Sequence, residues 1–308
     1  MTTPIIGIVG PTASGKTDLA LALDERMPVE VVVADSRQVY RGMDVGTAKP
    51  DAAARASVRH HLLDLVEPDE PFTVAHWVAL ARELIPAIGE RANLPLIVGG
   101  TGLYMSALLD GHDYGAHPSS AEVRQRLTNA LETEGLDALI ERLRSIDPLA
   151  AARVDLRNPR RLLRALERAE TGGGGADPHA DPYPGRVALI GLSRPREVLY
   201  RRIDDRAATL FAEGLLPEVA MLLERGYAPE LRPMTGHGYA EATRHLAGQW
   251  SLEEAIDATA RRTRQYAKRQ LTWFRRDPRI MWLPAGTLPA DEPSLVADAE
   301  RLVRSALG

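Results

Sequence analysis

The sequence GPTASGKT, residues 10–17, decides the fold of this chain, because it stands between an apolar run (IIGIV, residues 5–9) and a segment whose leucines have helical spacing. Gly-x-x-x-x-Gly-Lys-Thr between a strand and a helix is typical of a phosphate-binding loop. Its N–H groups and the helix N-terminus attract an anion, its lysine contacts phosphate oxygens, and its threonine hydroxyl suits Mg²⁺. The spacing fits a diphosphate as well as a triphosphate. The predicted diphosphate- or nucleotide-binding residues are Gly10, Pro11, Thr12, Ala13, Ser14, Gly15, Lys16 and Thr17, with Thr17 as the metal ligand.

Strand-like and helix-like segments alternate through the first hundred residues. Short apolar strands between helices are typical of a parallel sheet that is covered on both faces. We therefore predict an α/β fold with a P-loop NTPase-like parallel sheet core. The expected strands are residues 4–9, 30–33, 61–66 and 94–98, and the expected helices are residues 16–27 and 74–91.

This alternation stops near residue 116. Only helical periodicity follows, at residues 123–134, 136–145 and 159–171, before a Gly/Pro-rich linker at 172–185. A further strand is expected at 187–192 and a long amphipathic helix at 252–276. We predict a helical insertion domain, residues 116–184, within a core formed by residues 1–115 and 185–308.

Composition excludes several classes of protein. The chain has 308 residues, of which 44% are apolar, and a net charge of −4, so it can bury a core but has no global basic field. The absence of cysteine excludes disulfides and thiolate chemistry, and the eight histidines show no zinc-binding spacing. No apolar run approaches the roughly 20 residues of a membrane span, and the first residues do not resemble a signal peptide. We expect a cytoplasmic protein with no membrane contact.

An acid follows the second expected strand, in VVVADSRQVY at residues 31–40. Ligands of doubly wound sheets bind at the carboxyl ends of the strands, which is where Asp35 is expected. Asp35 could hold Mg²⁺ through water, or it could act as a general base that takes a proton from a nucleophile. A turn-forming or helix-capping role is also compatible with its spacing.

Six stretches of the sequence together resemble the bacterial tRNA dimethylallyltransferases, in the same order and over nearly the whole chain. The resemblance implies transfer of a dimethylallyl group from dimethylallyl diphosphate to N6 of adenosine 37, next to the tRNA anticodon. It also implies a Mg²⁺ requirement, release of diphosphate without use of ATP, and a monomer. The stretches are GPTASGKT (10–17), ADSRQVYRGMDVGTAKP (34–50), LIVGGTGLY (96–104), NPRRLLRALE (158–167), RRIDDRAATLFAEGLLPEV (201–219) and TRQYAKRQLTWFR (263–275).

The resemblance also implies roles for single residues. Asp35 matches the base that takes the proton of the adenine amine, Arg206 matches a diphosphate contact, and Thr101 matches a position near the target nucleotide. Gln38 matches a position that reads the adenine. From spacing alone, Arg206 would be a solvated helix residue and Thr101 a helix cap. The implied catalytic residues are Asp35, Thr101 and Arg206, and the implied tRNA contacts are Asp35, Ser36, Arg37, Gln38, Thr101, Arg124, Arg160, Arg161, Arg164, Lys268, Arg269, Gln270 and Arg275.

The segment from 261 to 279 holds eight Arg or Lys residues and one acid, Asp277. A helix there would place several of the cations on one face, opposite an apolar stripe. Such a face is also typical of an ordinary solvated helix. With the arginines expected on the insertion, we predict a clamp around an anticodon stem-loop. The stripe would be Leu252, Ile256, Ala260, Ala267, Leu271 and Phe274, and the basic face Arg261, Arg264, Lys268 and Arg275.

Three other functions fit parts of the sequence. A small-molecule kinase or NTPase would use Asp35 as a Walker B acid, but it gives the basic helix no role. A prenyltransferase of free adenylate would share the loop and the base, but it needs no wide RNA surface. A non-enzymatic RNA-binding module would leave the phosphate loop without a purpose.

Overall fold

A computed structural model describes residues 2–111, 121–172, 181–286 and 293–308. The chain divides into two compact units, one of residues 1–108 with 184–308 and the other of residues 109–183. The insertion was predicted to start at residue 116, so the second unit begins a few residues earlier than predicted. Most of the Gly/Pro-rich linker predicted at 172–185 lies outside the described residues.

The first unit is built on a six-stranded sheet in the order β3-β2-β4-β1-β5-β6, in which all neighbouring strands run parallel. The predicted α/β fold is therefore confirmed. The third strand is much shorter than predicted, and the edge strand β6 was not predicted. The strands are β1 (Ile5–Val9), β2 (Val29–Val33), β3 (His60–His61), β4 (Leu94–Gly99), β5 (Val187–Ser193) and β6 (Met281–Pro284).

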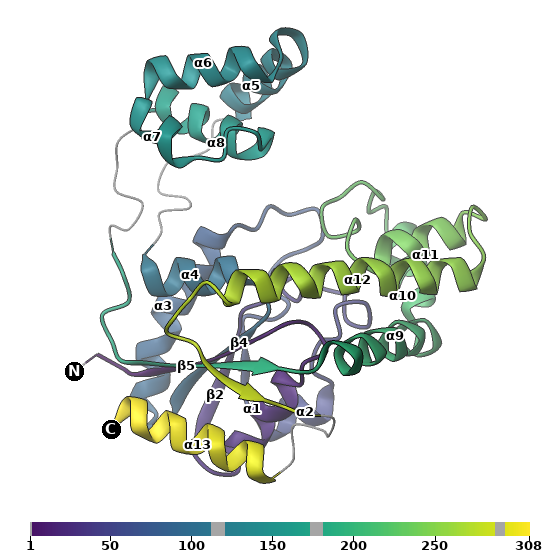
Figure 1. Ribbon diagram of the computed structural model, residues 1–308. Helices are drawn as coiled ribbons and strands as arrows, with labels where there is room; N and C mark the ends of the chain where they lie inside the picture. Colours follow the sequence, from purple (N-terminus) through teal and green to yellow (C-terminus); the bar gives the residue numbers. More distant parts are fainter. Residues whose placement is uncertain (1, 112–120, 173–180, 287–292) are drawn as a thin grey trace. The chain divides into compact units, whose positions relative to one another are not determined.

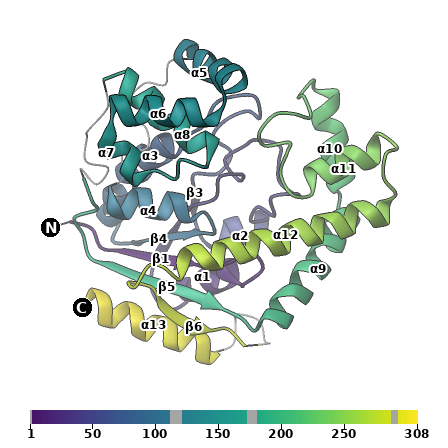
Figure 2. The same ribbon diagram turned by 45° about the horizontal axis from the view of Figure 1, so that its top comes forward.

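Helices cover both faces of this sheet (Figure 1, Figure 2). On one face, α1 (Lys16–Asp24) and α13 (Pro293–Leu307) share a buried core with alternate residues of the strands. On the other face lie α3 (Val74–Glu90) and α4 (Gly102–Asp110). The indole of Trp77 in α3 stacks on the ring of Tyr104 and donates a hydrogen bond of 2.8 Å to the Val33 carbonyl, which fixes α3 to β2.

The longest helix, α12 (Leu252–Phe274), follows the predicted 252–276 closely. Ser251 and Glu254 form a reciprocal capping box at its start, with bonds of 3.1 and 2.7 Å. Its buried side packs on α9 (Arg196–Ala212) through Ala267. Leu252 was predicted in the buried stripe but is 43% exposed, because it opens the helix beyond this contact. The remaining helices of this unit are α2 (Ala52–Ser57), α10 (Leu215–Glu224) and α11 (Tyr239–Leu246).

The second unit, within its described part, is helical and has its own core. Leucines and an isoleucine from three of its helices form that core: Leu127, Leu139, Ile140, Leu143, Leu162 and Leu166. The short helix α7 was not predicted from periodicity. It forms because the Asp147 side chain caps it and Pro148 occupies its first turn. The helices are α5 (Ala121–Glu134), α6 (Leu136–Ile146), α7 (Pro148–Arg153) and α8 (Pro159–Glu170).

Candidate active site

Three strands of the sheet end next to one another at their carboxyl ends. Strand β1 leads into the phosphate loop, β2 leads to Asp35, and β4 leads through two glycines to Thr101. A side chain at Gly99 would come within 2.1 Å of the Ala34 carbonyl oxygen, so glycine is needed for this close approach. The predicted base, the phosphate loop and Thr101 therefore share one edge of the sheet.

The phosphate loop turns into α1 at Gly15, whose φ of 97° is a left-handed conformation that glycine adopts readily. The Lys16 ammonium donates to the carbonyls of Gly10 (3.2 Å) and Pro11 (2.8 Å). Burial lowers the pKa of Lys16 to about 8, and Arg206 adds to this, while the charge of Asp35 opposes it. The buried Ser14 hydroxyl has no hydrogen-bond partner among the described residues, which is consistent with a loop that receives an anion.

Side chains from distant parts of the chain hold this loop in place. Gln270 of α12 accepts from the Thr12 N–H (2.9 Å) and donates to the Gly100 carbonyl (2.8 Å), so it ties the loop to the end of β4. Arg202 of α9 donates to the Ala13 carbonyl (3.0 Å). Gln270 was predicted among the tRNA contacts, but it is only 6% exposed. In this structure its side chain positions the phosphate loop.

Asp35 is held at the start of a turn. One of its carboxylate oxygens accepts from the Arg37 N–H at 2.8 Å. The Thr101 hydroxyl accepts from the neighbouring Ser36 N–H at 3.3 Å, and the Tyr266 side chain of α12 lies near Thr101. Burial, with the charge of Asp35 nearby, raises the pKa of Tyr266 to about 12, so it remains a neutral phenol. The Thr101 hydroxyl thus holds the backbone beside the carboxylate.

Backbone carbonyls hold the next two side chains of this segment, those of Arg37 and Gln38. The Arg37 guanidinium donates to the carbonyls of Arg232 and Pro233, the latter at 2.8 Å. The Gln38 amide nitrogen donates to the carbonyls of Thr47 (3.1 Å) and Ala48 (3.2 Å). Both residues were predicted as tRNA contacts. In this structure the head group of Arg37 is used inside the protein.

A cavity of about 450 Å³ brings together the residues predicted to bind the diphosphate and the residues predicted to contact the target adenine. Its lining includes Lys16, Thr17, Asp35, Gln38, Arg202 and Arg206. Burial lowers the pKa of the Arg206 guanidinium, with Asp35 and Asp18 opposing this shift. A second cavity of about 110 Å³ is also lined by Asp35 and Arg206. Cations and one carboxylate in one cavity can bind an anionic leaving group and accept a proton.

The loop fits a magnesium ion that is shared with a ligand. Among the described residues no three His, Asp or Glu side chains form a metal-binding group. Mg²⁺, however, commonly takes one or two protein ligands and completes its shell with water and substrate phosphates. Thr17 lies exposed at the cavity, which Asp18 and Asp35 also line, and this donor set suits such a partial site.

The outer side of α12 carries exposed cations and an exposed aromatic ring. Lys268, Arg269 and Arg275 are exposed, as predicted for RNA contacts, whereas Arg264 forms an ion pair with Asp204. The Trp273 ring is 40% exposed and lies against Gly102, where any side chain would come within 2.2 Å of it. Trp273 lines an open hollow of about 440 Å³ with Lys268, Arg269 and Arg276.

The predicted arginines of the second unit have different surroundings. Arg124 and Arg164 both pair with the buried Glu167, at 3.3 and 2.9 Å. Arg161 lies 3.9 Å from Asp155, and Arg160 is exposed on α8. Two of the four arginines are thus held by a buried carboxylate, which sets their direction.

Two protein-family models match the chain. A model described as IPP transferase matches residues 38–277, and one described as isopentenyl transferase matches residues 3–66. The chain belongs to the IPP transferase family. The resemblance carried by the six sequence stretches is therefore confirmed.

Individual members of the IPP transferase family are similar over most of their length. The chain is 46% identical to the tRNA dimethylallyltransferase of Syntrophobacter fumaroxidans, over 98% of this chain and 87% of that protein. The solved tRNA isopentenylpyrophosphate transferase from Bacillus halodurans has a TM-score of 0.74 at 39% identity, covering 100% of this chain and 97% of that one. A solved eukaryotic dimethylallyltransferase acting on tRNA has a TM-score of 0.80 at 25% identity, covering 99% of this chain and 79% of that one.

Four residues of this IPP transferase site were missed from the sequence: Arg202, Tyr266, Trp273 and Lys49. Arg202 stands in the same RRIDDR stretch as Arg206, but only the structure shows that it reaches the phosphate loop. Trp273 had a usable signal, since an aromatic ring among cations is typical of single-stranded RNA contacts. Lys49 lines the cavity from a loop that has no helical or strand periodicity.

In the described part of the chain, no helix has both the length and the apolar character for crossing a membrane.

Proposed function

We propose that this IPP transferase moves a dimethylallyl group from dimethylallyl diphosphate to N6 of adenosine 37 in tRNA and releases diphosphate. One observation carries the proposal: a single cavity holds the phosphate loop, two arginines and the carboxylate of Asp35. The relatives named tRNA dimethylallyltransferase support the same reaction.

The donor's diphosphate binds the loop of residues 10–17. In the transition state the bond between the allylic carbon and the diphosphate oxygen breaks, and negative charge grows on the leaving group. Lys16, Arg202 and Arg206 are fixed where they can stabilise that charge. The Thr17 hydroxyl would hold Mg²⁺, which adds positive charge at the diphosphate.

The acceptor is an exocyclic amine, which is a weak nucleophile because its lone pair is delocalised into the purine. As the bond from N6 to the allylic carbon forms, the nitrogen becomes acidic, and Asp35 takes one of its protons. General-base catalysis of this kind typically contributes about 10²–10⁴-fold. Asp35 lines the same cavity as Lys16 and Arg206, so donor and acceptor meet between opposite charges.

The target base is stacked in a loop of RNA and has to be extracted before it reacts. The basic face of α12, with Trp273, supplies phosphate contacts and a surface for unstacked bases. The arginines of α5 and α8 supply a second set of contacts. We propose that the partner is the anticodon stem-loop of tRNA and that the enzyme acts as a cytoplasmic monomer with Mg²⁺.

A transfer assay with labelled dimethylallyl diphosphate and unmodified tRNA tests this function, with AMP and ATP as parallel substrates. We expect label in the tRNA and none in either nucleotide. Label in AMP would indicate a prenyltransferase of free adenylate instead. ATP hydrolysis without label transfer would indicate an NTPase.

A further inference from the structure

A loop, MDVGTAK at residues 43–49, lines the cavity through Thr47, Ala48 and Lys49. A carboxylate from a distant helix holds the first part of this loop. Glu218 of α10 accepts from three consecutive backbone N–H groups: Asp44 (2.7 Å), Val45 (2.7 Å) and Gly46 (3.1 Å). Glu218 is 9% exposed, so these bonds form away from water. Charge-assisted bonds to a buried carboxylate are strong and direction-setting, so the turn at 44–46 has one preferred orientation.

Tyr239 of α11 completes this anchor. Its hydroxyl donates to the Glu218 carboxylate at 2.6 Å, and its ring packs against Gly46. A side chain at Gly46 would come within 2.4 Å of that ring, so the backbone packs directly on it. Burial, together with the Glu218 charge, raises the pKa of Tyr239, and the phenol therefore remains a hydrogen-bond donor.

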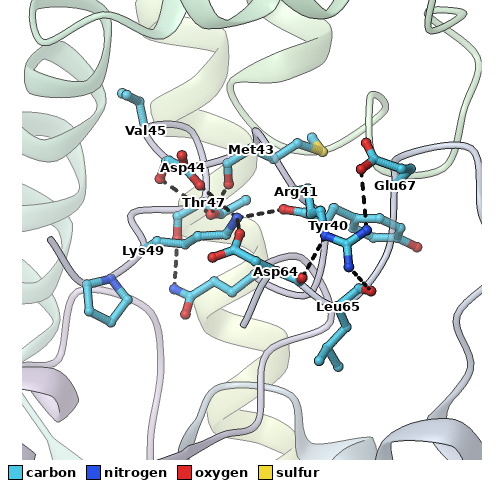
Figure 3. Close-up of polar contacts among 12 residues, drawn as sticks. Tyr40, Arg41, Met43, Asp44, Val45, Thr47, Lys49, Asp64, Leu65 and Glu67 are labelled. Atoms are coloured by element: carbon cyan, nitrogen blue, oxygen red, sulfur yellow. Dashed lines mark hydrogen bonds and ion pairs between the residues drawn. The ribbon is translucent and has the colours of Figure 1, made fainter. Parts of the chain in front are cut away.

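Lys49 holds the other end of the same loop (Figure 3). Its ammonium donates to the Tyr40 carbonyl (2.6 Å) and to the carboxylates of Asp44 (2.7 Å) and Asp64 (2.5 Å). The Lys49 side chain is 1% exposed, so these three acceptors fill its hydrogen-bonding capacity inside the protein. The residues between the two anchors, Thr47 and Ala48, are thereby fixed.

The fixed carbonyls of Thr47 and Ala48 determine how Gln38 is presented. Both carbonyls accept from the Gln38 amide nitrogen, at 3.1 and 3.2 Å, so its two hydrogens are used (Figure 3 shows the loop). What remains of the amide is its oxygen, which can only accept a hydrogen bond. Gln38 lines the cavity with Asp35, so the site offers one acceptor for each hydrogen of an exocyclic amine.

We propose that Glu218 and Tyr239 are positioning residues for the acceptor. They hold residues 44–46, fix the carbonyls of Thr47 and Ala48, and so aim the Gln38 oxygen at the amine of the target purine. A purine with a carbonyl oxygen in place of that amine would meet two acceptors and be rejected. This inference rests on the proposed function, since it concerns the base that accepts the prenyl group.

The test compares Glu218→Gln and Tyr239→Phe with Glu30→Gln. Glu30 is also a buried carboxylate, bound at 2.7 Å by Arg91, but it stands near the start of β2 and does not touch the loop. Three quantities are measured: amide hydrogen exchange at residues 44–46, kcat and KM for each substrate, and the dissociation constants of anticodon hairpins with adenosine or inosine at the target position.

In Glu218→Gln we expect exchange at 44–46 to become at least about tenfold faster, because an amide nitrogen cannot accept these bonds. The preference for the adenosine hairpin over the inosine hairpin should fall by about tenfold, the value of roughly one hydrogen bond. kcat should fall while KM for dimethylallyl diphosphate stays within about twofold. Tyr239→Phe should show the same changes at smaller size, and Glu30→Gln none of them.

Wild-type exchange at 44–46 in Glu218→Gln would overturn the inference, as would an unchanged preference for adenosine. Equal kinetic losses in Glu30→Gln would also overturn it, since they would show an effect of stability alone. If the wild-type enzyme transfers nothing to the adenosine hairpin, the proposed function fails. The exchange rates and hairpin affinities then still show whether Glu218 orients Gln38.

Discussion

At the scale of single residues, the site combines a preformed anion loop with a lysine whose charge depends on its surroundings. Lys16 donates to two loop carbonyls in the free enzyme, and its pKa of about 8 lies well below the ordinary value for lysine. A bound diphosphate would supply the negative charge that favours the protonated ammonium. We therefore expect the charge of the lysine to depend on pH near 8 before the donor binds and to depend on it much less afterwards.

Donor affinity should consequently depend on pH. Lys16 carries its charge below a pKa of about 8 and loses it above, so binding of a non-reactive thiolo analogue of the donor should weaken as pH rises through 8. The expected loss is up to tenfold per pH unit. Titration calorimetry between roughly pH 7 and 10 would measure this, with proton uptake on binding above pH 8. Lys16→Met should bind the analogue weakly, and its affinity should not fall as pH rises through 8. The same fall in affinity in that variant would rule Lys16 out as the cause.

Replacing the proposed base should separate binding from chemistry. Asp35→Asn keeps the size of the side chain and an oxygen that can accept from the Arg37 N–H. We expect kcat to fall by about 10²–10⁴-fold while hairpin and donor affinities stay close to wild type. Single-turnover transfer assays and hairpin titrations would measure the two effects. Turnover at the wild-type rate would exclude Asp35 as the base.

At the scale of elements, α12 connects the phosphate loop to the outer surface. Its buried side carries Ala267 and Gln270, and Gln270 holds Thr12 of the loop. Its outer side carries Lys268 and Trp273 within the same two turns. Under the proposed function, one helix thus supplies both a part of the donor site and a surface for RNA.

Cations on this helix should contribute to RNA affinity through phosphate contacts. Lys268→Ala with Arg275→Ala should weaken binding of an anticodon hairpin and lower the dependence of log K on log salt by about 1.4, or about 0.7 for each phosphate contact with single-stranded RNA. The difference from wild type is therefore largest at low salt. Fluorescence titrations across a salt series would measure it. Arg301→Ala on α13 serves as the control, and an equal loss there would point to a general charge effect.

The exposed ring of Trp273 should contribute to RNA affinity by stacking on a base, and not through phosphate contacts. Stacking of an unpaired base on an aromatic ring is typically worth about 1–3 kcal/mol and depends little on salt. Trp273→Ala should therefore weaken hairpin binding by about fivefold or more at every salt concentration. Donor affinity should not change. A loss that disappears at high salt would contradict stacking and indicate an electrostatic effect.

The strands and loops that form the site could be predicted because short, local sequence patterns indicate them. The apolar run before Gly10, the Gly-Lys-Thr spacing and the acid after β2 are all read from short stretches. The roles of Gln270 and Glu218 could not be read in this way, because each depends on a contact across more than 150 residues. Strand β6 was missed for a related reason: four residues show too little pattern, and pairing with β5 creates the strand.

At the scale of the whole molecule, the chain consists of a unit that contains the proposed active site and a helical unit with a separate core. The chain enters and leaves the helical unit side by side. The Tyr183 N–H donates to the Leu109 carbonyl at 3.1 Å, and Gly111 lies against Asp181. The helical unit can therefore be removed with a short connection.

Replacing residues 111–182 by a short Gly/Ser linker should leave the donor site intact, since every residue around the cavity belongs to the other unit. We expect unchanged affinity for the thiolo analogue and a loss of hairpin affinity of at least about tenfold, because the arginines of α5 and α8 are removed. Calorimetry and hairpin titration would show both. Full hairpin affinity without these residues would mean that the helical unit does not bind RNA.

The most direct measurement is a crystal structure of the enzyme with the thiolo analogue and an anticodon hairpin. We expect the diphosphate on residues 10–17 with Mg²⁺ at Thr17, and the N6 atom of the extracted adenine about 3 Å from an Asp35 carboxylate oxygen. An adenine whose amine lies beyond hydrogen-bonding reach of Asp35, or a diphosphate bound away from the loop, would contradict the proposed reaction.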